Sequence, residues 1–288
     1  METPVLLAVL CGAFLHAAWN VIVKGADDHE VDVALVHFLS AVAALPLLLW
    51  YGLPPPQAWP YILLSLSIHV AYYITLTGAY QHGELGTTYP IMRGTAPLLV
   101  AISSWLIFSE PLSLAGWAGV VAVTVGVLLV GLAHPGQALH QGRALGFALG
   151  NAAVIACYTL VDGAGVRLTA QTGHAIASYV LVLFVLDGVP YPALVMWRRG
   201  RTGWPQVRAL VQQRWGRALL GGLASLGSYG IALWAMTRAP LALVSALRET
   251  SVLFGAVMSV LILKERFGPQ RLIGAAVIVA GVVALRVG

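Results

Sequence analysis

Apolar residues are grouped along the whole chain into long segments separated by short polar stretches. Each segment is about 20 residues long, the length that a helix needs to cross the hydrocarbon core of a bilayer. Because lipid offers no partner to backbone N–H and C=O groups, such segments form helices. The pattern predicts an all-α integral membrane protein with ten transmembrane helices, which are 4–23, 33–52, 59–80, 86–108, 112–132, 144–162, 175–197, 217–237, 240–263 and 269–287.

The composition agrees with a membrane environment. Hydrophobic residues make up 59% of the 288 residues and charged residues only 9%, whereas about a quarter of a soluble domain is charged. The first segment lacks a small-residue cleavage site, which favours a retained helix over a signal peptide. Cys11 and Cys157 both lie in apolar segments, so no disulfide, metal site or cofactor is predicted.

Basic residues in the connections predict the orientation. Short loops rich in Lys and Arg stay on the cytoplasmic side, and the connection between segments seven and eight is the richest. Because the basic residues cluster in this connection, the net charge of +5 indicates an interaction with anionic lipid headgroups rather than with nucleic acid. We therefore expect both termini on the periplasmic side of a bacterial inner membrane. The arginines of that connection are Arg198, Arg199, Arg201, Arg208, Arg214 and Arg217, and the opposite side holds only Arg167, Arg238 and Arg286.

An internal repeat appears when residue 93 is placed over residue 248. Of the 35 ungapped positions that start there, 11 are identical. Shared apolar residues carry little weight in a membrane protein, but four polar or glycine pairs carry more. These pairs are Arg93/Arg248, Glu110/Glu265, Gly119/Gly274 and Gly126/Gly281.

The repeat unit has five helices, and an odd number inverts the second copy in the membrane. Inverted repeats place a site between the halves that can open to either side. We expect a first repeat over 1–135, a linker over 136–142 and a second repeat over 143–288, arranged around a central cavity. This architecture is typical of alternating-access transporters, and the site lies within one chain, so a monomer is expected to be functional.

Three stretches carry a family resemblance: "HAAWNVIVK" at 16–24, "SEPLSLAGWAG" at 109–119 and "KERFGPQRLIGA" at 264–275. They resemble the EamA-type branch of the drug/metabolite transporter superfamily, and within it most of all the YddG group of amino-acid exporters. The resemblance implies a cavity walled by helices 1, 3, 4, 6, 8 and 9, with helices 5 and 10 outside. It also implies a small-molecule substrate, most of all amino acids including aromatic and other apolar ones. The alternative is an intramembrane lipid-modifying enzyme, although the chain lacks the HExxH and GxSxG motifs of hydrolases.

Two arginines, Arg93 and Arg248, stand inside apolar segments. A charge there costs at least about 2.5 to 3.5 kcal/mol, so it faces a cavity or a partner. Arg93 either binds or gates a substrate, or serves a structural role, and its presence in both repeats favours a gating or structural role. Glu249 is the expected partner of Arg248.

Further polar and aromatic side chains fall on shared helix faces and suit a pocket for an amphipathic or aromatic amino acid. The other interpretation is helix packing or interfacial anchoring. The predicted substrate-binding residues are His16, Trp19, Asn20, His69, Tyr73, Tyr80, Tyr89, Asn151, Tyr158, Ser225 and Tyr229.

Three other features give weaker predictions. Gly142, Gly146 and Gly150 predict a ridge for close helix contact. Asp187 is a candidate for proton binding or a helix-end residue. The acidic stretch 27–32 predicts a solvated turn or, less readily, a metal site.

Overall fold

The computed structural model describes residues 1–24, 28–131, 142–263 and 268–287. Within these ranges it has ten helical segments long and apolar enough to cross a membrane, and it has no strand. The predicted all-α membrane fold is confirmed. Its helices are α1 (Thr3–Lys24), α2 (His29–Tyr51), the 3₁₀ turn η1 (Pro56–Ala58), α3 (Trp59–His82), α4 (Leu85–Phe108), α5 (Leu114–Gly131), α7 (Gly142–Gln171), α8 (Ile176–Asp187), α9 (Pro190–Met236), α10 (Leu241–Arg248), α11 (Ser251–Leu263) and α12 (Pro269–Val287).

Two predicted helices are broken. The seventh ends at Asp187, and α9 begins at Pro190, so Asp187 is a helix-end residue. The ninth is divided into α10 and α11, where the N–H groups of Glu249 and Thr250 bond to carbonyls three residues back. Such tight turns interrupt an α-helix and change the direction of its side chains.

Two boundaries predicted from polarity are wrong. The arginine-rich stretch 198–217, predicted as a loop, is part of α9 and contains a turn at Gly200, whose φ is +58°. We call this stretch the elbow. The sixth helix, predicted to end at residue 162, continues as α7 to Gln171, so Arg167 lies in a helix and not in a connection. Its polar residues find partners inside the protein and therefore do not end the helix.

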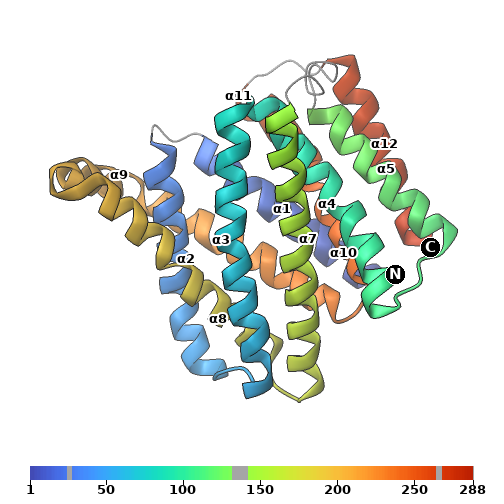
Figure 1. Ribbon diagram of the computed structural model, residues 1–288, viewed down its shortest axis with the longest axis horizontal. Coiled ribbons are helices and arrows are strands. Elements are labelled where there is room, and N and C mark those ends of the chain that lie inside the picture. The colour runs from blue at the N-terminus through green and yellow to red at the C-terminus, as the bar shows by residue number, and fades with distance from the viewer. Residues whose placement is uncertain (25–27, 132–141, 264–267, 288) are drawn as a thin grey trace.

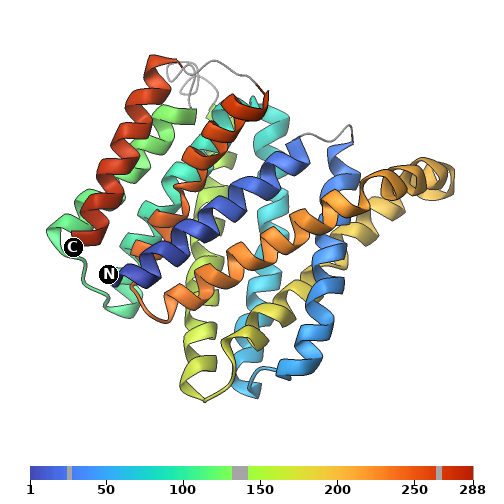
Figure 2. The ribbon, with the colours of Figure 1, turned by 180° about the vertical axis from the view of Figure 1, so that it is seen from behind.

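The helices form two layers (Figures 1 and 2). One layer contains α3, α4 and α7, which pack against one another. Behind it, α1 packs against α9 and α11, and α2 packs against α8 and α9. The elbow extends from one end of the bundle, and both chain termini lie toward the opposite end. We call these the elbow end and the terminal end. Residues 132–141, which include most of the predicted linker, lie outside the described ranges.

Helices α5 and α12 pack side by side at the edge of the bundle (Figure 1). A Cβ added to Gly119 would lie 2.9 Å from the carbonyl oxygen of Gly281, and one added to Gly126 would lie 2.9 Å from that of Gly274. The two helices therefore cross antiparallel. Gly119 faces Gly281, which aligns with Gly126, and Gly126 faces Gly274, which aligns with Gly119. This is the contact that a two-fold axis in the membrane plane produces.

Close packing at this crossing gives a test by substitution. Gly126→Ala is expected to lower the free energy of unfolding by about 1 to 3 kcal/mol, because the new methyl group meets backbone atoms that cannot move aside. Thermal unfolding in detergent measures the effect. Gly146→Ala is the matched control, since a Cβ there meets nothing within 4 Å. An equal or smaller loss at Gly126 than at Gly146 would contradict this packing.

The ridge predicted on α7 is wrong. A Cβ added to Gly142 or Gly146 would meet no atom within 4 Å, and one added to Gly150 would meet only a methyl carbon of Thr75 at 3.9 Å. Glycines make close helix contacts elsewhere, between α5 and α12 and between Gly222 of α9 and the backbone of α2.

Candidate functional site

An ion pair joins the two halves of the chain inside the bundle. Arg93 Nε of α4 lies 3.0 Å from Glu249 Oε2, and the two side chains are only 11% and 5% exposed. The break between α10 and α11 gives Glu249 this direction. Glu249, predicted as the partner of Arg248, is thus paired with Arg93 instead. In a low-dielectric interior, the attraction between the two opposite charges offsets the free-energy cost of removing each from water.

Arg248 lies on an aromatic ring in the second half. Its guanidinium carbon is 5.2 Å from the centre of the Tyr229 ring, a distance at which the ring's negative face attracts a cation. Phe184 packs at 6.2 Å from the same ring. Within the described ranges no carboxylate forms an ion pair with Arg248, which leaves its N–H donors open to an anion.

The hydroxyl of Tyr229 points to a carboxylate that the sequence analysis missed. Tyr229 donates a hydrogen bond to Asp162 Oδ2, and Tyr179 donates one of 2.9 Å to Asp162 Oδ1. Asp162 lies on α7 with 0% of its surface exposed. The three residues come from α7, α8 and α9, and Tyr229 connects this carboxylate to Arg248.

Aromatic rings continue from this group across the bundle. The Tyr158 ring is stacked on His69 at 4.7 Å and meets Tyr72 edge-on at 6.3 Å. Tyr72 contacts Tyr73, and Tyr73 is stacked on Tyr191 of α9 at 5.6 Å. The chain of rings thus runs from α7 through α3 to α9 and includes three of the predicted residues, His69, Tyr73 and Tyr158.

The predicted face of α1 is half-buried and bonded within itself. Trp19 Nε1 donates to His16 Nδ1 at 3.3 Å, and Asn20 Nδ2 donates to the carbonyl oxygen of His16 at 2.7 Å. Helix α1 packs against α9 and α10, the helices that carry Tyr229 and Arg248. The predicted face therefore belongs to a helix that contacts this part of the bundle.

The remaining predicted residues are dispersed. Asn151 is buried and donates to the Tyr72 carbonyl oxygen at 3.0 Å and to Thr75 at 2.9 Å, which joins α7 to α3. Tyr89 lies on α4 one turn before Arg93 and is half-buried, as is Ser225 on α9. Tyr80 is 37% exposed.

A second ion pair lies at the terminal end. Arg167 of α7 pairs with Glu110 and donates to the carbonyl oxygens of Met236 and Ala239 at 2.7 and 3.2 Å. Glu110 in turn accepts a bond of 3.0 Å from the N–H of Leu241, at the start of α10. We call Glu110 and Arg167 the terminal lock, because they tie three helix ends and the α4–α5 connection together. A pocket of about 460 Å³ lies against it.

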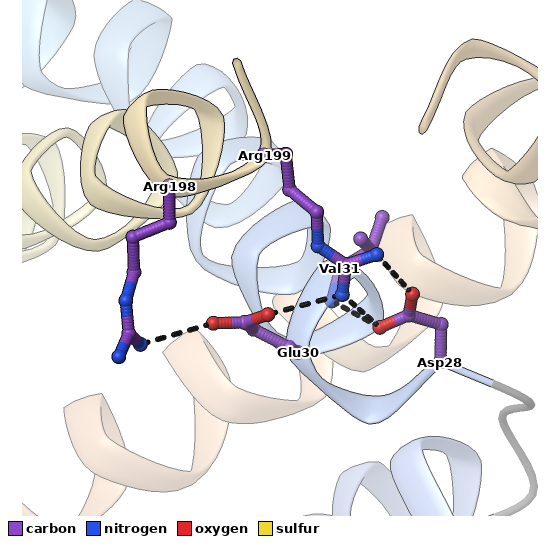
Figure 3. Close-up of polar contacts among 5 residues, drawn as sticks. All are labelled: Asp28, Glu30, Val31, Arg198 and Arg199. Atoms are coloured by element: carbon purple, nitrogen blue, oxygen red, sulfur yellow. Dashed lines mark hydrogen bonds and ion pairs between the residues drawn. The ribbon is translucent and has the colours of Figure 1, made fainter. Parts of the chain in front are cut away.

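At the elbow end, the acidic start of α2 is paired with the elbow (Figure 3). Arg199 donates to Asp28 and to Glu30 at 3.0 Å each, and Arg198 donates to Glu30 at 3.3 Å. Asp28 also accepts from the N–H of Val31 at 3.2 Å and caps α2. Asp28 and Glu30 stay partly exposed, and guanidinium groups occupy their oxygens, a pairing that the sequence did not predict.

This pairing favours the ionised form of the Asp28 carboxyl. Partial burial raises the pKa of its carboxyl, but hydrogen bonds from Arg199 and the Val31 N–H lower it by more, so the pKa lies below its ordinary value. A carboxyl with a lowered pKa in the folded state stabilises the protein above its unfolded-state pKa of about 3.9. That contribution is lost as the pH falls through the folded-state pKa.

Asp28→Asn is expected to lower the Tm at pH 7, because asparagine keeps the helix cap but loses the ion pair. The difference from wild type should shrink as the pH falls below about 4, where the wild-type carboxyl is protonated as well. Thermal unfolding between pH 7 and pH 3 measures it, with Glu2→Gln at the exposed N-terminus as the control. A Tm difference that does not change over this range would contradict the assigned pairing.

The residues that sequence reasoning missed have a common cause. Asp162 and Arg167 follow the apolar part of α7, where polar residues suggested that the helix had ended. Their partners are Tyr179, Tyr229 and Glu110, which lie far away in the sequence. No local sequence pattern connects these partners to α7, so only the folded structure shows the pairing.

Comparisons with known proteins bear on the fold and the family. A solved crystal structure superposes on 99% of the chain and 96% of its own, with a TM-score of 0.74 and 17% sequence identity, which shows a shared fold. A stretch of 73 residues is 30% identical to the spermidine export protein MdtI of Salmonella arizonae and covers 67% of that protein. The sequence pattern of the EamA-like transporter family matches the chain twice, over residues 3–132 and over residues 143–287. The chain therefore belongs to the EamA-like transporter family.

Proposed function

We propose that this transporter exports amino acids, including aromatic and other apolar ones, across the bacterial inner membrane by alternating access. The assignment to the YddG group of amino-acid exporters is part of the proposal. Its energy source is treated below as a separate inference.

The observation that carries the proposal is the position of Arg248, whose cation lies on the Tyr229 ring without a paired carboxylate among the residues that the structure describes. A guanidinium with open donors suits the carboxylate of an amino acid. The neighbouring ring of Phe184 suits an apolar or aromatic side chain, and Trp19 of α1 is proposed to add a second ring. The His16–Asn20 face of α1 supplies polar groups for the amino end.

The balance of charge supports a zwitterion over a polycation. Two arginines, Arg93 and Arg248, lie in this region with two carboxylates, Asp162 and Glu249. Both carboxylates already hold partners, a pair of tyrosines and Arg93 respectively. A polyamine, the substrate in the name of MdtI, needs acidic groups that are open to it.

The terminal lock supports alternating access. It binds helix ends from both halves on one side of the membrane, and releasing it would separate them there. The termini at that end are proposed to be periplasmic, since the arginines of the elbow occupy the other end. The site lies within one chain, so we propose a functional monomer.

Counterflow into liposomes that hold only the purified protein tests the function. Wild type is expected to exchange radiolabelled phenylalanine with saturation, and unlabelled tryptophan to compete better than spermidine. Arg248→Gln should weaken the apparent affinity roughly ten- to a hundredfold, the value of a charged hydrogen bond of about 1.5 to 3 kcal/mol. Arg143→Gln, on the exposed first turn of α7, is the matched control.

Three outcomes would contradict the proposal. They are an absence of exchange, an equal effect of both substitutions, and competition by spermidine alone. The turnover of a membrane lipid by the purified protein would favour the alternative, an intramembrane lipid-modifying enzyme.

A further inference from the structure

Asp162 is an ionisable group that amino-acid binding does not use. It lies in the membrane-spanning helix α7 with 0% exposure, whereas Arg248 and the α1 face border the proposed substrate region. Ionisable residues inside a membrane are costly to keep and commonly mark proton relays and ion pathways. The role of Asp162 therefore needs an explanation of its own.

The groups that face Asp162 come from four helices. Tyr179 of α8 and Tyr229 of α9 donate to its two oxygens, and the buried Ser65 and the ring of His69 neighbour it from α3. Tyr158 lies on its own helix and interacts with it electrostatically. Within the described ranges no lysine or arginine forms an ion pair with Asp162.

The other intramembrane carboxylates have different partners. Asp187 lies 3.2 Å from His37 Nδ1, with both side chains 26% exposed, and Glu249 is paired with Arg93. Among the described residues, the direct partners of the Asp162 carboxylate are neutral hydroxyls. A proton therefore neutralises Asp162 without breaking an ion pair.

Hydrogen-bond arithmetic shows what protonation does here. An ionised carboxylate only accepts, and each tyrosine hydroxyl donates its one proton to a different oxygen of Asp162. A protonated carboxyl has a donor of its own, and its hydroxyl oxygen accepts poorly. Protonation therefore weakens or reverses at least one tyrosine bond.

We propose that Asp162 is the proton-binding residue that couples export to proton entry. The carboxylate takes up one proton from the terminal end, becomes a carboxylic acid, and releases the proton to the elbow end while one substrate molecule moves the opposite way. Tyr229 transmits the change, because its hydroxyl is held by Asp162 and its ring carries Arg248. The inference rests on the proposed function for the identity of the substrate, but not for proton binding.

Asp162→Asn separates coupling from transport. Asparagine has the shape of the protonated carboxyl and cannot release a proton. In liposomes with the membrane potential clamped, a gradient of one pH unit drives about tenfold phenylalanine accumulation in one-for-one exchange. For Asp162→Asn we expect this ratio to fall to 1, with counterflow at equal pH retained. Asp187→Asn, a matched carboxylate in the same half, should behave as wild type.

Infrared difference spectroscopy of the solubilised protein tests proton binding without substrate. Acidification protonates exposed carboxyls in every variant, so the readout is the additional carboxylic-acid band of a buried group, which should be present in wild type and Asp187→Asn and missing in Asp162→Asn. If wild type does not move phenylalanine, the proposed substrate class fails, and the band still decides the role of Asp162. Should Asp162→Asn not fold, Tyr179→Phe replaces it, and the pH midpoint of gradient-driven export should then shift upward, since the carboxylate loses a donor.

Four results would overturn the inference. They are a band that persists in Asp162→Asn, gradient-driven accumulation that survives in it, the loss of counterflow together with coupling in a monodisperse protein, and an unchanged midpoint in Tyr179→Phe. The third result would leave Asp162 a positioning residue for Tyr229.

Discussion

Glu249→Gln is expected to lower the free energy of unfolding by about 3 to 5 kcal/mol, the cost of leaving one member of a buried ion pair without its partner. Arg93 is only 11% exposed, so water cannot replace the lost carboxylate. The effect is measured by heating the protein in mild detergent and recording the temperature at which it ceases to be monodisperse. The loss should be greater than that of any other single substitution named here.

A double substitution distinguishes the pair from general damage. Arg93→Met combined with Glu249→Leu removes both charges at similar volume, and replacing both members of a buried pair is often neutral. We expect the double variant to unfold near the wild-type temperature, while each single variant unfolds earlier. A double variant as unstable as the sum of the two singles would show that the pair contributes no coupling energy.

Arg167→Gln is expected to open the terminal end. The arginine makes an ion pair and two charged hydrogen bonds there, and each such bond contributes about 1.5 to 3 kcal/mol. Loss of even one corresponds to a change of about tenfold in the ratio of closed to open molecules. A cysteine introduced for the buried Ser245 of α10 reports the change as faster labelling by a membrane-impermeant maleimide.

The labelling experiment needs two controls. Cys11 and Cys157 are both exposed, so they are first replaced by alanine. Arg238→Gln removes a neighbouring exposed arginine that does not take part in the terminal lock, and its labelling rate should match the parent. Equal rates for Arg167→Gln and Arg238→Gln would mean that the lock does not hold this end closed.

The length of the apolar segments predicted the helices well, because lipid enforces both length and polarity. The breaks were predicted unevenly. Gly188 and Pro190 are visible interruptions, whereas the break before Thr250 contains neither glycine nor proline and accompanies the pairing of Glu249 with a distant helix. The elbow was misread as a loop for a related reason. Arginine is a good helix former, and acidic partners on α2 hold the elbow in place.

Sequence reasoning singled out two charged residues of the candidate site but not their contacts. A charge in an apolar segment has to be explained, so Arg93 and Arg248 were identified. Sequence distance then gave the wrong partner, because Glu249 adjoins Arg248 but is directed to Arg93. The aromatic stacking of His69 on Tyr158 joins different repeats and follows from the packing of α3 on α7 alone.

The crossing of α5 and α12 has a consequence for how the molecule can change. Each glycine of one helix rests on the counterpart of its neighbour, which is the isologous contact of a symmetric dimer, now held within one polypeptide. A larger residue at one of these positions meets the backbone of the helix opposite, so it can be accommodated only if the facing helix shifts or changes as well.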